Sequence, residues 1–126
     1  MNMTVFDIML IPDKPIKEIA KLARLVDEGG FDTLWIADES PVPNFRDPFT
    51  VLTAAALNTK NVKLGTGIAI PYHYHPVLMA VAISSLVEAT EGRITVGLGP
   101  GGTMPLRPLG LKVWDRPVTA LQELEA

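Results

Sequence analysis

The sequence predicts an α/β fold made of four parallel (β/α) units. Apolar runs suited to strands begin near residues 5, 33, 63 and 94, a spacing of about 30 residues that accommodates one strand and one crossover helix. Each run is almost continuously apolar, as expected for parallel strands that are covered on both faces. An open doubly wound sheet and an eight-stranded (β/α) barrel both have this pattern, and both bind ligands at the carboxyl ends of the strands.

The first two units follow directly from local patterns. Residues 5–11 form an apolar, partly β-branched run, and the apolar residues of 16–26 recur at helical spacing. Two glycines at 29–30 stop that helix. Residues 33–37 then predict a second buried strand, which brings the carboxylates of residues 38–39 to its carboxyl end.

The later units are predicted from capping residues, prolines and apolar runs. Asp47 is placed to cap a helix that has Pro48 at its first position. A strand follows at residues 62–70, a helix begins at Pro76, and a fourth strand spans 94–98. A fourth helix is expected to start near residue 117 and to continue to the end of the sequence. Residues 1–126 are therefore expected to form a single four-unit domain.

Composition limits the classes of function. The chain has 126 residues, a net charge of −3 and 48% hydrophobic residues, which describes one globular domain. Its scattered Lys and Arg residues disfavour nucleic acid and anionic lipid as partners. Without cysteine, redox chemistry has to come from a bound cofactor. The sequence contains no apolar run of membrane-spanning length and no recognisable signal peptide, so we expect a cytoplasmic protein.

Carboxylates are the first candidates for catalysis. Asp38 and Glu39 follow the second strand, where they can act as an acid/base pair or simply close the strand with polar groups. Asp7 is expected at or near the same ligand-binding end. We predict that at least one of these carboxylates has a role beyond solubility.

Glycines mark the candidate ligand-binding segments. Two of them interrupt the third strand, where glycine indicates a bulge or the close approach of another group. After the fourth strand, residues 97–102 fit the pattern G-x-G-x-x-G, but the following prolines keep the chain irregular, which disfavours a nicotinamide site. We expect these two segments to contact a ligand through their backbone. The residues concerned are Gly65, Thr66, Gly67, Ile68, Ala69, Gly99 and Gly101.

The two histidines and two tryptophans suggest structural roles. His73 and His75 are suitably spaced to bind a metal together, but no third ligand is evident, and His75 directly precedes Pro76, where it can cap a helix. We therefore predict no metal site. Trp35 and Trp114 are expected to pack in the core or against helices.

Three segments of the sequence resemble the bacterial luciferase-like superfamily. They are GFDTLWIADE, RDPFTVLTAAALNTKNVKLGTGIAIPYHYHP and SSLVEATEGRITVGLGPGG. The likeness is greatest to the reductases of that superfamily that use coenzyme F420, such as methylenetetrahydromethanopterin reductase, and it covers their amino-terminal half. It implies the first half of a TIM-type (β/α)8 barrel, a cofactor that is coenzyme F420 or FMN, and a small-molecule substrate.

The resemblance also gives the glycines of the third strand a function. Family members have a non-prolyl cis peptide at the bend after this strand, where it supports the tricyclic ring of the cofactor. The matching bond is Gly67–Ile68, and it is therefore predicted to be cis. In many relatives a histidine directly follows the aspartate of strand two, whereas this chain has Glu39.

The implied activity is hydride transfer between reduced coenzyme F420 and a small substrate. An FMN-dependent monooxygenase and a non-catalytic binding or assembly module are the alternatives. A barrel needs eight strands and the sequence predicts four, so two strand edges and the inner face of the sheet are expected to be uncovered. We therefore expect a fragment of a longer chain, a homo-oligomer, or a subunit whose barrel is completed by a partner chain, and we expect the isolated chain to be inactive.

Overall fold

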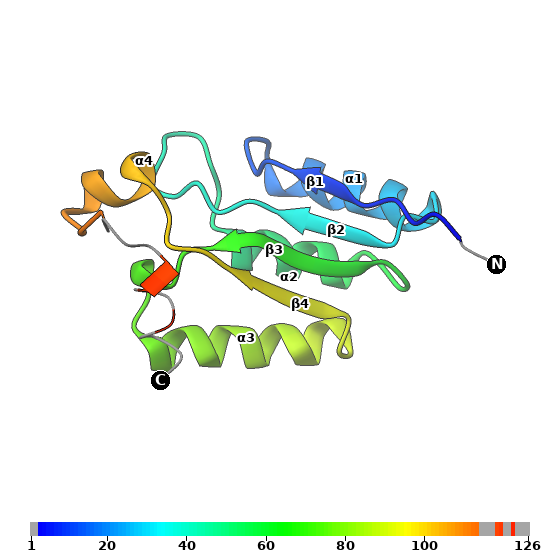
Figure 1. The fold of residues 1–126 in the computed structure, drawn as a ribbon. Helices are drawn as coiled ribbons and strands as arrows, with labels where there is room; N and C mark the ends of the chain where they lie inside the picture. Colours follow the sequence, from blue (N-terminus) through cyan, green and yellow to red (C-terminus); the bar gives the residue numbers. More distant parts are fainter. Residues whose placement is uncertain (1–2, 114–117, 120–121, 123–126) are drawn as a thin grey trace.

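Four parallel strands form one sheet, in the order β1-β2-β3-β4. The computed structural model describes residues 3–113, 118–119 and 122. Figure 1 shows that all four strands point to the same end of the molecule, as the predicted half-barrel requires. The strands are β1 (Ile8–Leu10), β2 (Thr33–Ile36), β3 (Lys63–Ala69) and β4 (Ile94–Leu98). The helices are α1 (Ile16–Glu28), α2 (Pro48–Leu57), α3 (Pro76–Thr90) and the short α4 (Thr103–Leu106), with 3₁₀ turns η1 (Pro71–His73) and η2 (Arg107–Leu109).

The core lies between the sheet and its helices. Helix α2 contacts both α1 and α3, and α1 and α2 lie behind the sheet in Figure 1. Alternate residues of the central strands face this layer and are fully buried, including Leu34, Ile36 and Leu64. None of the helices in the described part of the chain is long and apolar enough to cross a bilayer.

The helix ends confirm the predictions from capping residues. The Asp47 carboxylate accepts hydrogen bonds from the backbone N–H and the hydroxyl of Thr50 at 2.8 and 2.9 Å, and Pro48 occupies the first position of α2. His75 caps α3, because its Nδ1 accepts from the backbone N–H of Val77 at 3.2 Å. Gly30 has φ +77 just after α1, a conformation that glycine adopts without steric cost.

Two predicted elements differ from the structure. Strand β1 covers only three residues instead of the seven predicted, because regular pairing with β2 is confined to Ile8, Met9 and Leu10. After β4 the chain was expected to be irregular, yet α4 forms with Pro105 at its third position. Proline is tolerated there because a helix cannot use its first N–H groups anyway. The helix predicted near residue 117 lies largely outside the described residues.

The other face of the sheet carries no helix in the described part of the chain (Figure 1). Trp35 lies on this face rather than in the core, contrary to expectation. Its ring covers Gly65, since a Cβ at Gly65 would come within 2.5 Å of two Trp35 ring atoms. On the neighbouring strand, Met9 is paired with Trp35 in register and is 58% exposed. Trp114 lies outside the described residues.

Asp7 does not lie at the ligand-binding end of the sheet, so that expectation was wrong. It precedes β1 and is therefore at the amino end, whereas ligands of parallel α/β sheets bind at the carboxyl end. Its carboxylate accepts from the backbone N–H of Thr33 at 3.2 Å and from Nε1 of Trp35 at 3.0 Å. Asp7 thus ties β1 to β2 and fixes the Trp35 ring.

Candidate functional site

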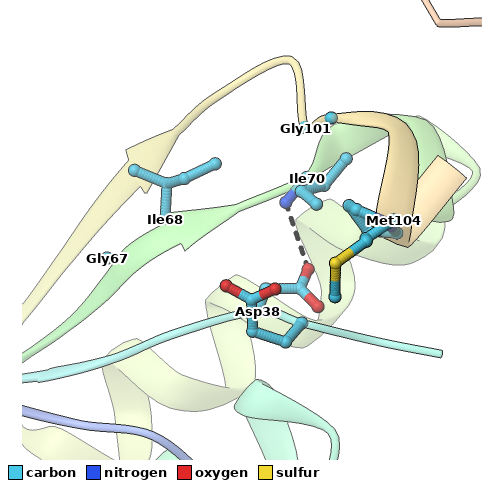
Figure 2. Close-up of a pocket in the computed structure, with 9 residues that line it drawn as sticks. Asp38, Gly67, Ile68, Ile70, Gly101 and Met104 are labelled. Atoms are coloured by element: carbon cyan, nitrogen blue, oxygen red, sulfur yellow. Dashed lines mark hydrogen bonds between the residues drawn. The ribbon is translucent and has the colours of Figure 1, made fainter. Parts of the chain in front are cut away.

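A pocket of about 410 Å³ opens at the carboxyl ends of the strands. Loops after β2 and β4 and the end of β3 form its walls, and Figure 2 draws the lining residues as sticks and labels six of them. Two carboxylates lie among apolar side chains and glycine backbone. The lining residues are Asp38, Glu39, Gly67, Ile68, Ile70, Gly101, Gly102, Met104 and Pro105.

Asp38 joins the end of β2 to the end of β3. Its Oδ2 accepts from the backbone N–H of Ile70 at 3.1 Å, the contact drawn as a dashed line in Figure 2, and its Oδ1 accepts from the backbone N–H of Ser40 at 3.3 Å. The residue is only 5% exposed. These contacts compensate for burial of a carboxylate, so Asp38 holds the pocket together as well as lining it.

Glu39 is the more accessible of the two carboxylates. It is half-buried and lines the pocket, and its carbonyl accepts from the backbone N–H of Val42 at 2.9 Å in a tight turn. The Ser40–Pro41 bond that follows is cis. A pocket that contains one buried and one accessible carboxylate can hold a polar group and exchange a proton with it.

The end of β3 bends sharply beside these carboxylates. The Gly67–Ile68 bond is cis, which confirms the prediction. The pairing of β3 with β4 also loses its register between Thr66 and Ala69. The Ile68 side chain remains 37% exposed, and Figure 2 shows it across the pocket from Asp38. This bend therefore forms an apolar wall opposite the carboxylates.

Some of the residues predicted to contact a ligand do line the pocket. Asp38, Glu39, Gly67, Ile68 and Gly101 are among the lining residues. Gly101 has φ +71, a backbone conformation that strongly favours glycine.

The other four predicted residues lie outside the pocket lining, because their groups are occupied within the sheet. Gly65 lies under the Trp35 ring. Thr66 is fully buried and donates its hydroxyl to the carbonyl of Gly97 at 2.8 Å. The Gly99 N–H donates to the carbonyl of Ala69 at 3.1 Å, and the Ile68 side chain fills the space where a Cβ of Gly99 would lie. The bare Gly99 amide expected to face a ligand is therefore already used.

Ile70 and Gly102 also line the pocket and lie within the two segments expected to contact a ligand, whereas Met104 and Pro105 were not predicted as ligand contacts. In Figure 2 the Met104 side chain extends from α4 toward Asp38. The position of Met104 and Pro105 beyond the end of β4 is the one signal that could have found them, because ligands bind where parallel strands end.

Tyr74, near the site, is not a suitable proton donor. Burial, and then the carboxylates of Asp47 and Asp38, raise the pKa of its hydroxyl. The hydroxyl already donates to Asp47 Oδ1 at 3.1 Å. Within the described residues, no group of three or more His, Asp or Glu side chains could hold a metal ion.

Comparison with known proteins identifies the family. The family model described as luciferase-like monooxygenase matches residues 2–124. The chain belongs to this family. It is 39% identical over 118 residues to 5,10-methylenetetrahydromethanopterin reductase of Methanolobus tindarius, covering 94% of this chain and 35% of that relative.

Solved structures give the same result. The coenzyme F420 dependent tetrahydromethanopterin reductase of Methanopyrus kandleri superimposes with a TM-score of 0.84 at 34% identity, over 96% of this chain and 38% of that one. The oxygenating constituent of 3,6-diketocamphane monooxygenase of Pseudomonas putida, in complex with FMN, matches with a TM-score of 0.67 at 28% identity, over 77% of this chain and 30% of that one. The chain thus spans little more than a third of the length of the reductases it matches, and its four units have the arrangement of half of a TIM-type barrel.

Proposed function

We propose that this half-barrel supplies one side of the site for a flavin-type cofactor, coenzyme F420, in an oxidoreductase that transfers hydride between the reduced cofactor and a small substrate. The observation that carries the proposal is the bend at Gly67–Ile68 facing Asp38 and Glu39 across one pocket. The F420-dependent reductase from M. kandleri, which is 34% identical over 96% of this chain, supports the choice of cofactor.

The residues of the pocket fit the ring of such a cofactor. A volume of about 410 Å³ is within the usual size of small-molecule sites, which combine apolar walls with a few polar groups. Ile68, Ile70 and Met104 provide apolar surface, and the open space beside Gly102 leaves room for a planar group. None of the described lining residues is basic, so the anionic tail of the cofactor has to be held elsewhere.

The residues then have distinct roles. The backbone at Gly67 and the Ile68 side chain support the apolar face of the ring. Glu39 is the candidate for holding or moving a proton, because it is the more exposed carboxylate. Asp38 keeps the ends of β2 and β3 together through Ile70. When bound, the cofactor supplies the hydride chemistry, for which the chain has no redox-active cysteine.

FMN is the second candidate cofactor, in a monooxygenase. The match to the FMN complex from P. putida, at 28% identity over 77% of this chain, favours it. The same walls suit either ring, since both are tricyclic.

We also propose that the uncovered face of the sheet and the edges of β1 and β4 are completed by a second copy of the chain. Apolar side chains along the first strand segment are largely exposed. They are Val5 at 65%, Phe6 at 66%, Met9 at 58% and Ile11 at 51%. Exposed apolar surface next to an open strand edge favours association.

Cofactor binding to the 126-residue chain tests the proposal, with Met104→Ala as the variant and Leu109→Ala as its control. Both residues are apolar and exposed, at 63% and 49%, and only Met104 lines the pocket. Covering the exposed part of a methionine contributes roughly 1–2 kcal/mol. Truncating Met104 should therefore weaken binding about fivefold to thirtyfold, and truncating Leu109 by less than about twofold.

FMN and coenzyme F420 would each be titrated separately, following the fluorescence of the cofactor. Tighter binding of F420 supports the reductase, and tighter binding of FMN supports the monooxygenase. If neither cofactor binds, or if the two truncations weaken binding equally, this pocket is not the cofactor site.

A further inference from the structure

His73 lies behind the pocket and joins two of its walls. The 3₁₀ turn η1 places its side chain, which is 5% exposed, against the fully buried carboxylate of Asp38. The distance from Nδ1 to Asp38 Oδ2 is 3.4 Å, and that from Nε2 to the Pro105 carbonyl oxygen is 3.3 Å. Asp38 and Pro105 both line the pocket and His73 does not. The imidazole therefore lies between the loop after β2 and the segment after β4.

Both oxygens that face the ring can only accept a hydrogen bond, because one belongs to a carboxylate and the other to a backbone carbonyl. A ring with a hydrogen on each nitrogen can donate to both. Either neutral tautomer would turn a nitrogen lone pair toward one of these oxygens. The contact to Asp38 is at ion-pair distance, and Nδ1 makes no hydrogen bond with the described residues.

We propose that His73 is a positioning residue for the cofactor pocket. It holds Asp38 from Nδ1 and the Pro105 segment from Nε2, and so fixes the separation of the two walls. This role rests on the proposed function, since it concerns the same pocket. The segment held by His73 also carries Met104, and Asp38 in turn holds the Ile70 amide at 3.1 Å, so loss of His73 should loosen both sides of the pocket.

The neighbouring His75 provides a matched control. It is exposed and caps α3 through Val77, and His75→Asn keeps a side chain able to cap. We expect His73→Leu to weaken binding of FMN or coenzyme F420, whichever the unmodified chain binds, about fivefold or more, because it removes the buried polar contacts to Asp38 and to the Pro105 carbonyl. His75→Asn should leave binding unchanged.

A double-mutant cycle with Asp38→Asn separates positioning from a general loss of packing. If His73 acts through Asp38, His73→Leu should cost less than about twofold in binding when Asp38 is already changed. Equal losses in the two backgrounds would contradict the proposal. His73→Asn, whose amide nitrogen can reach the place of Nδ1, should recover more binding than His73→Leu, and failure to do so would also count against it.

A measurement without cofactor keeps the two proposals distinguishable. Because the chain has two histidines, the His75→Asn variant leaves one imidazole for ¹⁵N NMR of labelled histidine at neutral pH. We expect Nδ1 of His73 to carry hydrogen, and to lose it in the Asp38→Asn background. An Nδ1 without hydrogen in the unmodified Asp38 background would refute the link. Failure of both cofactors to bind would instead refute the proposed function and leave the NMR result to decide the His73 contact.

Discussion

Gly65 is expected to be the position in β3 that least tolerates a side chain. A Cβ there would lie 2.5 Å from two ring atoms of Trp35 and 3.0 Å from the Thr95 carbonyl oxygen. Carbon atoms pack favourably at about 3.5–4.0 Å, so the ring would have to move by roughly 1 Å, away from a position that Asp7 fixes through a 3.0 Å hydrogen bond to Nε1. The Thr95 oxygen belongs to the backbone of β4 and can move less.

The expected magnitude follows from these contacts. Overpacking costs about 1–3 kcal/mol, and a weakened hydrogen bond adds about 0.5–1.5 kcal/mol. We therefore expect Gly65→Ala to lower the free energy of unfolding by roughly 2–3 kcal/mol. Gly102→Ala is the control, because no atom lies within 4 Å of a Cβ at that position and its φ is not positive. It should change the stability by less than about 0.5 kcal/mol.

The assay is urea unfolding followed by far-UV circular dichroism at one protein concentration, for Gly65→Ala, Trp35→Leu and the double variant. If the Trp35 ring causes the cost, Gly65→Ala should cost under about 1 kcal/mol in the Trp35→Leu background, which corresponds to a coupling of at least about 1 kcal/mol. Effects that add to within about 0.5 kcal/mol would refute the conclusion that the ring requires glycine at this position.

Two further predictions concern pH and assembly. Burial alone would raise the pKa of Asp27, but its hydrogen bonds from the N–H groups of Lys60, Val62 and Asn61, together with the charge of Arg93, lower it below 3.8. Since the lowered pKa belongs to the folded state, the stabilisation is present above the unfolded pKa of about 3.9 and is lost as pH falls through the folded value. Asp27→Asn should therefore lower the free energy of unfolding at pH 7 by about 1–2 kcal/mol, and its stability should fall less steeply below pH 4. Equal acid-unfolding curves for the variant and the unmodified chain would disprove this. For assembly, light scattering at micromolar concentration should give the mass of a dimer or larger assembly, and a compact, stable monomer would contradict the proposed pairing of uncovered sheet faces.

The sequence by itself determined the elements whose causes are local. A strand or a capped helix depends on residues a few positions apart, so the Asp47 and His75 caps and the bounds of β4 were predictable. The parallel orientation of the strands followed from the repeat of one strand and one helix. The resemblance of several segments to one family added the cis bond at Gly67–Ile68, which no local propensity would have specified.

Only the tertiary structure decided what surrounds each candidate residue. Asp7 holds Trp35, 28 residues away, and Asp38 holds Ile70, 32 residues away. Ile68 fills the space beside Gly99 that had been assigned to a ligand. His73 contacts the Asp38 carboxylate and the Pro105 carbonyl, and both of these residues are also distant from it in the sequence. Each of these contacts crosses from one (β/α) unit to the next, and their distances depend on strand register, the bend of β3 and side-chain packing, which local sequence patterns do not encode.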